Sequence, residues 1–146
     1  MRAPIRVFSP ARQLVVLPET HAQVGRAQVA LADLAEEPFI TYPSQHRSVV
    51  HDAVLDACQA AGFTPRATEV AETSTLVSFV AAGLGVALVP ESVQHLRITG
   101  AAYRPLADAS PTVELAVATR RGETSPAVRQ VLVVTQGLLH AGEEDV

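Results

Sequence analysis

Apolar residues along this chain alternate between short continuous runs and series with a spacing of three and four. Continuous runs that end in proline or polar residues predict buried strands. A spacing of three and four predicts helices with one buried face. The predicted strands cover 12–17, 39–42, 66–71, 86–89, 101–104 and 113–119, and the predicted helices cover 29–34, 48–61, 73–82, 90–96 and a last segment from 125.

Glycine and proline mark the ends of these elements. Gly62 stands just past the helix at 48–61, and Gly83 is the natural stop of the next helix. Ser125 and Pro126 are a cap followed by proline at the first helical position, which is typical of a helix start. Gly85 follows Gly83 between a helix and a strand, the reverse of the order in a dinucleotide-binding motif, and is interpreted as part of a turn.

Strands that alternate with helices favour an α/β fold with a mostly parallel sheet covered on both faces. In such sheets, ligands bind at the carboxyl ends of the strands. The polar loop at 42–47 leaves a predicted strand at such an end and enters the helix at 48–61. Free N–H groups and the helix dipole at that point favour an anion, with Arg47 adding charge and Ser48 a hydroxyl. The alternative is that Ser48 only caps the helix and Arg47 is solvated.

Other candidate chemistry is weaker. The five histidines are scattered without the spacing of zinc ligands, and we expect them on the surface or in loops. Ser48 and His51 are close in sequence, but no carboxylate is obviously placed to orient the imidazole, so nucleophilic catalysis is disfavoured. Cys58 lies on the apolar face of its helix and is expected to be an unreactive core residue. We expect neither a cofactor nor a metal.

Composition narrows the choice of class. The 146 residues suit one domain, and a single cysteine excludes an internal disulfide. No apolar run is long enough to span a membrane and no signal pattern starts the chain, so we expect a cytoplasmic protein. The formal net charge of −4 disfavours non-specific binding to nucleic acid, which depends on neutralising phosphates.

Four blocks in a fixed order carry a resemblance to a known family. Together they resemble the effector-binding domain of LysR-type transcriptional regulators, and the match covers nearly the whole chain from about Arg12. The stretch from Val80 to Pro90 is the most specific part. The blocks are Leu-Ala-Asp-Leu-Ala-Glu-Glu-Pro-Phe-Ile at 31–40, Ala-Ala-Gly-Phe-Thr-Pro at 60–65, the segment 76–90, and Tyr-Arg-Pro-Leu at 103–106.

The resemblance implies a fold like that of type 2 periplasmic binding proteins, with two α/β lobes and an effector between them. Residues 26–119 would form the second lobe, and 1–25 and 120–146 would be remnants of the first lobe and the crossing segments of one truncated domain. The winged helix-turn-helix and linker helix of the family are expected to be absent, so DNA would be bound only by a longer form. That form would be a homo-oligomer, a dimer or tetramer.

The resemblance also implies the ligand and its site. The effector would be a small organic acid, aromatic or dicarboxylic, and the domain would not be an enzyme. Ser48, Val49 and Val50 occupy positions where family members that respond to aromatic acids or muconate contact the effector carboxylate. The full set of expected effector-binding residues is Pro43, His46, Arg47, Ser48, Val49, Val50, Thr73 and Ser74. The alternatives are a fragment of a periplasmic-type solute-binding protein and, less favoured, an enzyme on the same fold.

Overall fold

The computed structural model of the chain describes residues 5–45, 48–108 and 110–141. They fall into two compact units, Ala11–Val113 and a smaller one formed by Met1–Pro10 with Glu114–Val146. From the sequence we expected the division near 26 and 119. In the structure, residues 11–25 group with 26–113 in the larger unit.

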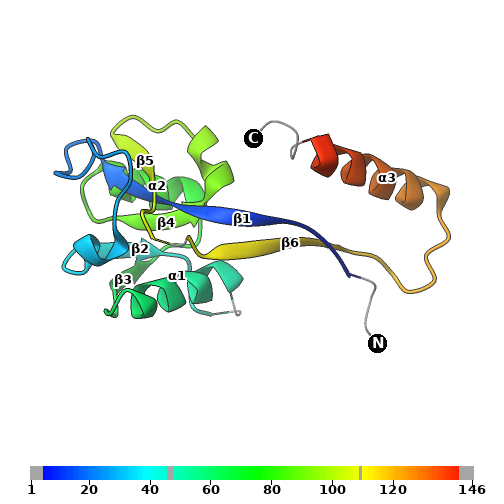
Figure 1. The fold of residues 1–146 in the computed structure, drawn as a ribbon, viewed down its shortest axis with the longest axis horizontal. Helices are drawn as coiled ribbons and strands as arrows, with labels where there is room; N and C mark the ends of the chain where they lie inside the picture. The colour runs from blue at the N-terminus through cyan, green and yellow to red at the C-terminus, as the bar shows by residue number, and fades with distance from the viewer. Residues whose placement is uncertain (1–4, 46–47, 109, 142–146) are drawn as a thin grey trace. The chain divides into compact units, whose positions relative to one another are not determined.

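Strand β1 (Ile5–Pro18) begins in the smaller unit and continues from Ala11 into the larger one (Figure 1). It pairs antiparallel with β4 (Ala87–Pro90) through Gln13–Val16 and with β5 (Ala101–Pro105) through Leu14–Pro18. Strands β2 (Pro38–Thr41) and β3 (Arg66–Glu69) pair parallel with each other. A parallel bridge between Phe39 and Val86 joins β2 to β4.

The expected α/β fold is confirmed, but β1 departs from the mostly parallel arrangement, since it runs antiparallel to β4 and β5. The segment that links β1 to β2 contains only a 3-10 helix, η1 (Leu31–Leu34), and no crossover α-helix that would return the chain in the same direction. Strands β1, β4, β5 and β6 (Thr112–Ala118) form one sheet, the parallel pair β2 and β3 forms another, and the Phe39–Val86 bridge just before β4 connects the two. Because that bridge is parallel, the carboxyl ends of β2, β3 and β4 point the same way, as the site prediction required.

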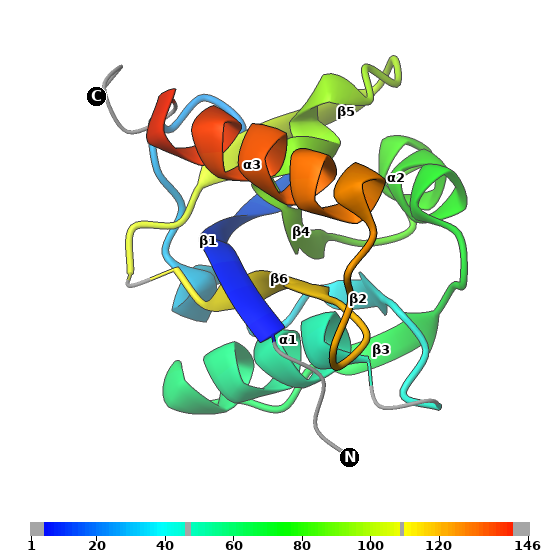
Figure 2. The ribbon, with the colours of Figure 1, turned by 90° about the vertical axis from the view of Figure 1, so that its right-hand side faces the viewer.

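Alternate residues of β1 pack on opposite faces. Val15 and Leu17 join a cluster that includes Val54 and Cys58 of α1 (Val49–Ala60). Val16 joins a second cluster with Leu76 of α2 (Thr73–Ala81). Helices α1 and α2 thus cover opposite faces, with β2 and β4 between them (Figure 2). This follows from the strand period of two, which sends neighbouring side chains to opposite sides.

Most predicted boundaries lie close to the observed ones, but β1 begins at Ile5 rather than at Arg12, and the helix predicted at 29–34 is the shorter 3-10 helix η1. Gly62 and Gly83 have φ angles of 90° and 79°, in the left-handed region that a helix stop requires. The predicted turn at 90–96 is the 3-10 helix η2 (Glu91–His95). Strand β6 (Thr112–Ala118) pairs with β1, and α3 (Pro126–Ala141) begins with the predicted proline. None of the helices in the described part of the chain has the length and apolar character that crossing a bilayer requires.

Candidate functional site

Tyr42 connects the carboxyl edge of the sheet to the starts of two helices. It follows the last residue of β2, and its hydroxyl lies 3.0 Å from Thr73 Oγ1 at the first turn of α2. Its carbonyl accepts a hydrogen bond of 2.8 Å from Nδ1 of His51 in the first turn of α1. Burial raises the pKa of Tyr42, which the hydrogen bond to Thr73 partly offsets. The N-termini of α1 and α2 are therefore both anchored to the same strand end.

The first turn of α1 offers backbone donors. Ser48 is extended, with φ −66° and ψ 112°, and its Oγ accepts the N–H of His51 at 3.3 Å, so Ser48 caps the helix, as the alternative interpretation expected. The N–H of Asp52 donates to the Ser48 carbonyl. The N–H groups of Val49 and Val50 precede the intrahelical pattern and bond to no residue in the described part of the chain. Val49 is 64% exposed and Val50 is of intermediate exposure, so the first turn of α1 lies near the surface.

The first turn of α2, like that of α1, has backbone N–H groups without an intrahelical acceptor. Its N-cap residue, Glu72, makes no side-chain capping bond, and the Glu72 carbonyl accepts the N–H of Leu76. Thr73 and Ser74 occupy the first helical positions, where N–H groups have no intrahelical acceptor. The expected residues Thr73 and Ser74 thus begin α2, as Val49 and Val50 begin α1, and Tyr42 contacts both helix starts.

The carboxylate of Glu69 lies at the carboxyl end of β3, beside the loop that follows β2. Ser44 donates its backbone N–H to Oε1 of Glu69, the last residue of β3, at 3.1 Å, which ties the loop after Pro43 to the strand. Hydrogen bonding from Ser44 lowers the pKa of Glu69, and the nearby His51 ring lowers it further. Glu69 is therefore ionised at neutral pH and places a negative charge near the first turn of α1.

The position of His51 corrects an expectation. We expected the histidines on the surface or in loops, but His51 is only 6% exposed and donates from Nδ1 to the Tyr42 carbonyl. His21 is also largely covered and contacts Glu37. His95 is exposed, as expected. The burial of His51 could not be predicted from its neighbours in sequence, because its hydrogen-bond partner is a backbone carbonyl nine positions away.

The structure describes most of the residues predicted to bind the effector. Ser48, Val49, Val50, Thr73 and Ser74 lie at the two helix starts, while His46 and Arg47 lie outside the described residues. Sequence reasoning missed Tyr42, Ser44, His51 and Glu69. Only Tyr42 carried a usable signal, since an aromatic hydroxyl directly after a strand end can reach a neighbouring helix start. In the described ranges, no three His, Cys, Asp or Glu side chains are grouped in a way that could hold a metal ion.

Cys58 gives a simple test of the core. It is fully buried in the cluster under α1, and burial raises the pKa of its thiol to about 11. The nucleophile is the thiolate, which is a very small fraction of the thiol at neutral pH. We expect a thiol reagent such as dithionitrobenzoate to leave the folded chain unmodified and to label it fully in urea. Rapid labelling of the native chain would contradict this burial.

Comparison with known proteins identifies the family. The model of the LysR substrate binding domain matches residues 4–136. The transcriptional regulator BudR of Raoultella terrigena is 31% identical over 129 residues, which cover 88% of this chain and 44% of BudR. CatR of Pseudomonas putida is 34% identical over 122 residues, 83% of this chain and 42% of CatR. The chain therefore spans less than half the length of these relatives.

Solved structures show the same fold. The BenM effector binding domain with its effector benzoate has a TM-score of 0.82 at 27% identity, over 98% of this chain and 65% of that one. Full-length BenM also has a TM-score of 0.82 at 27% identity, over 100% of this chain and 49% of that one. The relatives are regulators rather than enzymes, which agrees with the expectation from the sequence. The chain belongs to the family of LysR substrate binding domains, as its sequence blocks predicted.

Proposed function

We propose that this chain is the effector-sensing part of a LysR-type transcriptional regulator and that it binds a small aromatic monocarboxylate at the first turn of α1. The observation that carries the proposal is the pair of N–H groups at Val49 and Val50, near the surface beside the capping Ser48. Benzoate is the effector named for the BenM domain, whose fold this chain shares. It is therefore the first ligand to test.

The physical basis is the chemistry of a helix start. The α1 dipole places partial positive charge on its first turn, which favours an anion by about 0.3–1 kcal/mol. Hydrogen bonds to a charged group add about 1.5–3 kcal/mol. Two adjacent N–H donors suit the two oxygens of one carboxylate. The hydroxyls of Tyr42 and Thr73 supply further polar contacts at the same edge.

The charge of Glu69 favours one carboxylate over two. Hydrogen bonding from Ser44 lowers the pKa of Glu69, which is therefore ionised, and Glu69 lies near the His51 ring. His51 is in the same first turn as Val49 and Val50. A second carboxylate on the ligand would add a charge that Glu69 repels. We therefore expect benzoate to bind more tightly than the dicarboxylate cis,cis-muconate at low ionic strength.

The longer regulator would supply the remaining functions. We propose that it forms a homo-oligomer and binds DNA through a helix-turn-helix domain outside the present 146 residues. The relatives BudR and CatR are HTH-type transcriptional regulators, which supports this assignment. The effector would act by binding one arrangement of the oligomer more tightly than another, since a ligand shifts an equilibrium only through its differential affinity.

Val49→Pro tests the site by deleting a single donor. Proline is favoured at the first helical position, and the preceding Ser48 already has the extended conformation that proline requires. The exposed Val49 side chain makes little packing contribution. Losing one N–H bond to a carboxylate should weaken benzoate binding by about 1.5–3 kcal/mol, which is about 10-fold or more. The dissociation constant is measured by calorimetric or NMR titration.

Val49→Ala is the matched control because it removes the same side chain and keeps the N–H. We expect its benzoate affinity and the thermal unfolding temperature of both variants to stay near those of the unaltered chain. Equal affinities for Val49→Pro and Val49→Ala would contradict the assigned donor. Failure of the unaltered chain to bind either benzoate or muconate would contradict carboxylate recognition at this edge.

A further inference from the structure

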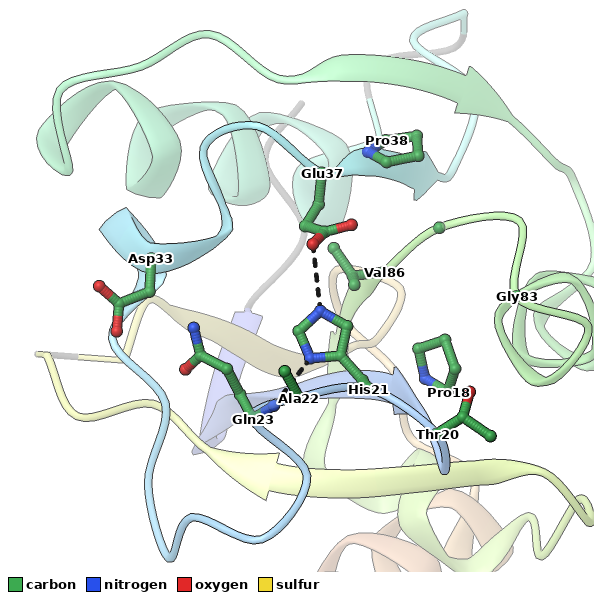
Figure 3. Close-up of a pocket in the computed structure, with 11 residues that line it drawn as sticks. Pro18, Thr20, His21, Ala22, Gln23, Asp33, Glu37, Pro38, Gly83 and Val86 are labelled. Atoms are coloured by element: carbon green, nitrogen blue, oxygen red, sulfur yellow. Dashed lines mark hydrogen bonds and ion pairs between the residues drawn. The ribbon is translucent and has the colours of Figure 1, made fainter.

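A cavity lies at the opposite end of β2 from the proposed effector site. It has a volume of about 450 Å³, and its wall includes Pro38, the first residue of β2, whereas the effector site lies beyond Thr41, the last. The loop after β1, the start of β2 and the turn after α2 form its walls (Figure 3). None of the expected effector-binding residues lines it.

The hydrogen bonds of His21 determine its protonation. The backbone N–H of Gln23 donates to Nδ1 at 3.1 Å, so this nitrogen carries no proton. The other nitrogen, Nε2, therefore carries the proton and donates to Oε1 of Glu37 at 3.2 Å, as the dashed lines in Figure 3 indicate. In this arrangement the imidazole is neutral. It orients the Glu37 carboxylate without cancelling its charge.

Among residues that are otherwise mostly apolar or glycine, three side chains of the wall carry carbonyl or carboxylate oxygens, those of Gln23, Asp33 and Glu37. The second oxygen of Glu37 bonds to no described residue, and its side chain is 40% exposed. Oε1 of Gln23 is buried and receives no hydrogen bond. Asp33 forms an ion pair with Arg26 at 3.2 Å. Both side chains are largely exposed, so water screens the pair and Arg26 offsets the negative charge of Asp33 only weakly. Gly83 follows the carboxyl end of α2, where the helix dipole is negative.

We propose that this cavity binds a small organic ammonium compound, with Glu37 as its counter-ion and the Gln23 carbonyl as a second acceptor. An ammonium group donates up to three hydrogen bonds and accepts none, which complements these acceptor oxygens. The buried Oε1 of Gln23 destabilises the fold while it lacks a hydrogen bond. A rotation of the Gln23 side chain that brings Oε1 to the ammonium group would therefore be favourable.

An organic cation fits better than a metal ion. The protonated Nε2 of His21 cannot serve as a metal ligand while it donates to Glu37. The described residues contain no group of three side chains that could hold a metal. The volume also exceeds what one ion needs, and it accommodates a short aliphatic chain between Pro18 and Val86.

Titration with 1,4-diaminobutane tests the proposal on the 146-residue chain at low ionic strength. We expect saturable binding by NMR or calorimetry, with shifts at His21 and Gln23. Glu37→Gln keeps an oxygen acceptor for His21 and removes the charge, so it should weaken binding at least about five-fold, the effect of losing one partly exposed ion pair of about 1 kcal/mol. Its unfolding temperature should stay close to that of the unaltered chain.

Glu36→Gln is the matched control. It changes the net charge by the same amount at the neighbouring exposed position, which does not line the cavity. We expect diamine affinity to be unchanged in this variant and benzoate affinity to be unchanged in both. Absence of saturable binding, or an equal loss in the two variants, would overturn the proposal. Displacement of the diamine by an equal concentration of Mg²⁺ would overturn the choice of an organic cation.

Discussion

A Gly85→Ala variant is expected to lose about 3 kcal/mol of its free energy of unfolding, at the upper end of the usual cost of overpacking. A Cβ atom at Gly85 would overlap the Pro38 carbonyl oxygen and lie 3.0 Å from its carbon. Both are backbone atoms, so no side-chain rotation can relieve the contact. The same Pro38 oxygen accepts the N–H of Val86, and the Val86 carbonyl accepts the N–H of Ile40. Separating these segments would weaken the only bridge recorded between β2 and β4 in the described residues.

The matched control for this clash is Gly25→Ala. A Cβ atom at Gly25 would have no heavy atom within 4 Å, and its backbone is not left-handed. The two variants therefore differ in the contact and not in the chemistry of the substitution. Urea unfolding followed by circular dichroism should show a large loss for Gly85→Ala and little change for Gly25→Ala. Similar midpoints for the two would mean that β2 and β4 can move apart without cost.

Local sequence signals predicted the elements because each boundary has a local cause. Gly62 and Gly83 adopt positive φ angles that few other residues tolerate, and Ser48 accepts a hydrogen bond from a residue three positions on. Such causes are readable from a few neighbouring residues. The first turn of α1 could therefore be proposed as an anion site from the sequence, with Val49 and Val50 as donors.

Pairing between distant segments could not be predicted from local sequence signals. The direction of β1 depends on β4 and β5, which follow it by about seventy residues or more along the chain. The contact between Ser44 and Glu69 spans 25 positions, and that between Tyr42 and Thr73 spans 31. Their residue types are ordinary for loops and helix starts. The residues around the proposed carboxylate site therefore depend on the pairing of distant strands, which local sequence patterns do not specify.

Gln13 is a buried side chain whose presence local patterns do not explain. It is 1% exposed, and neither Oε1 nor Nε2 of its amide has a hydrogen-bond partner. Its backbone is well satisfied, because Ser110 Oγ accepts the Gln13 N–H at 2.8 Å and donates to its carbonyl at 2.9 Å. Gln13 and Ser110 each lie three positions from a point where the chain passes between the two units, after Pro10 and after Val113.

Replacing Gln13 by methionine should therefore stabilise the chain. Methionine has a similar length and volume, fills the same space and carries no strong hydrogen-bonding group. Removing an unpaired buried amide should recover about 1–3 kcal/mol, raising the urea midpoint without changing the slope. Ser110→Ala is the opposite test, because it leaves the Gln13 N–H and carbonyl without their partner and should cost about 1–3 kcal/mol. A lower midpoint for Gln13→Met would show that the amide is hydrogen-bonded in solution, for example by a buried water molecule.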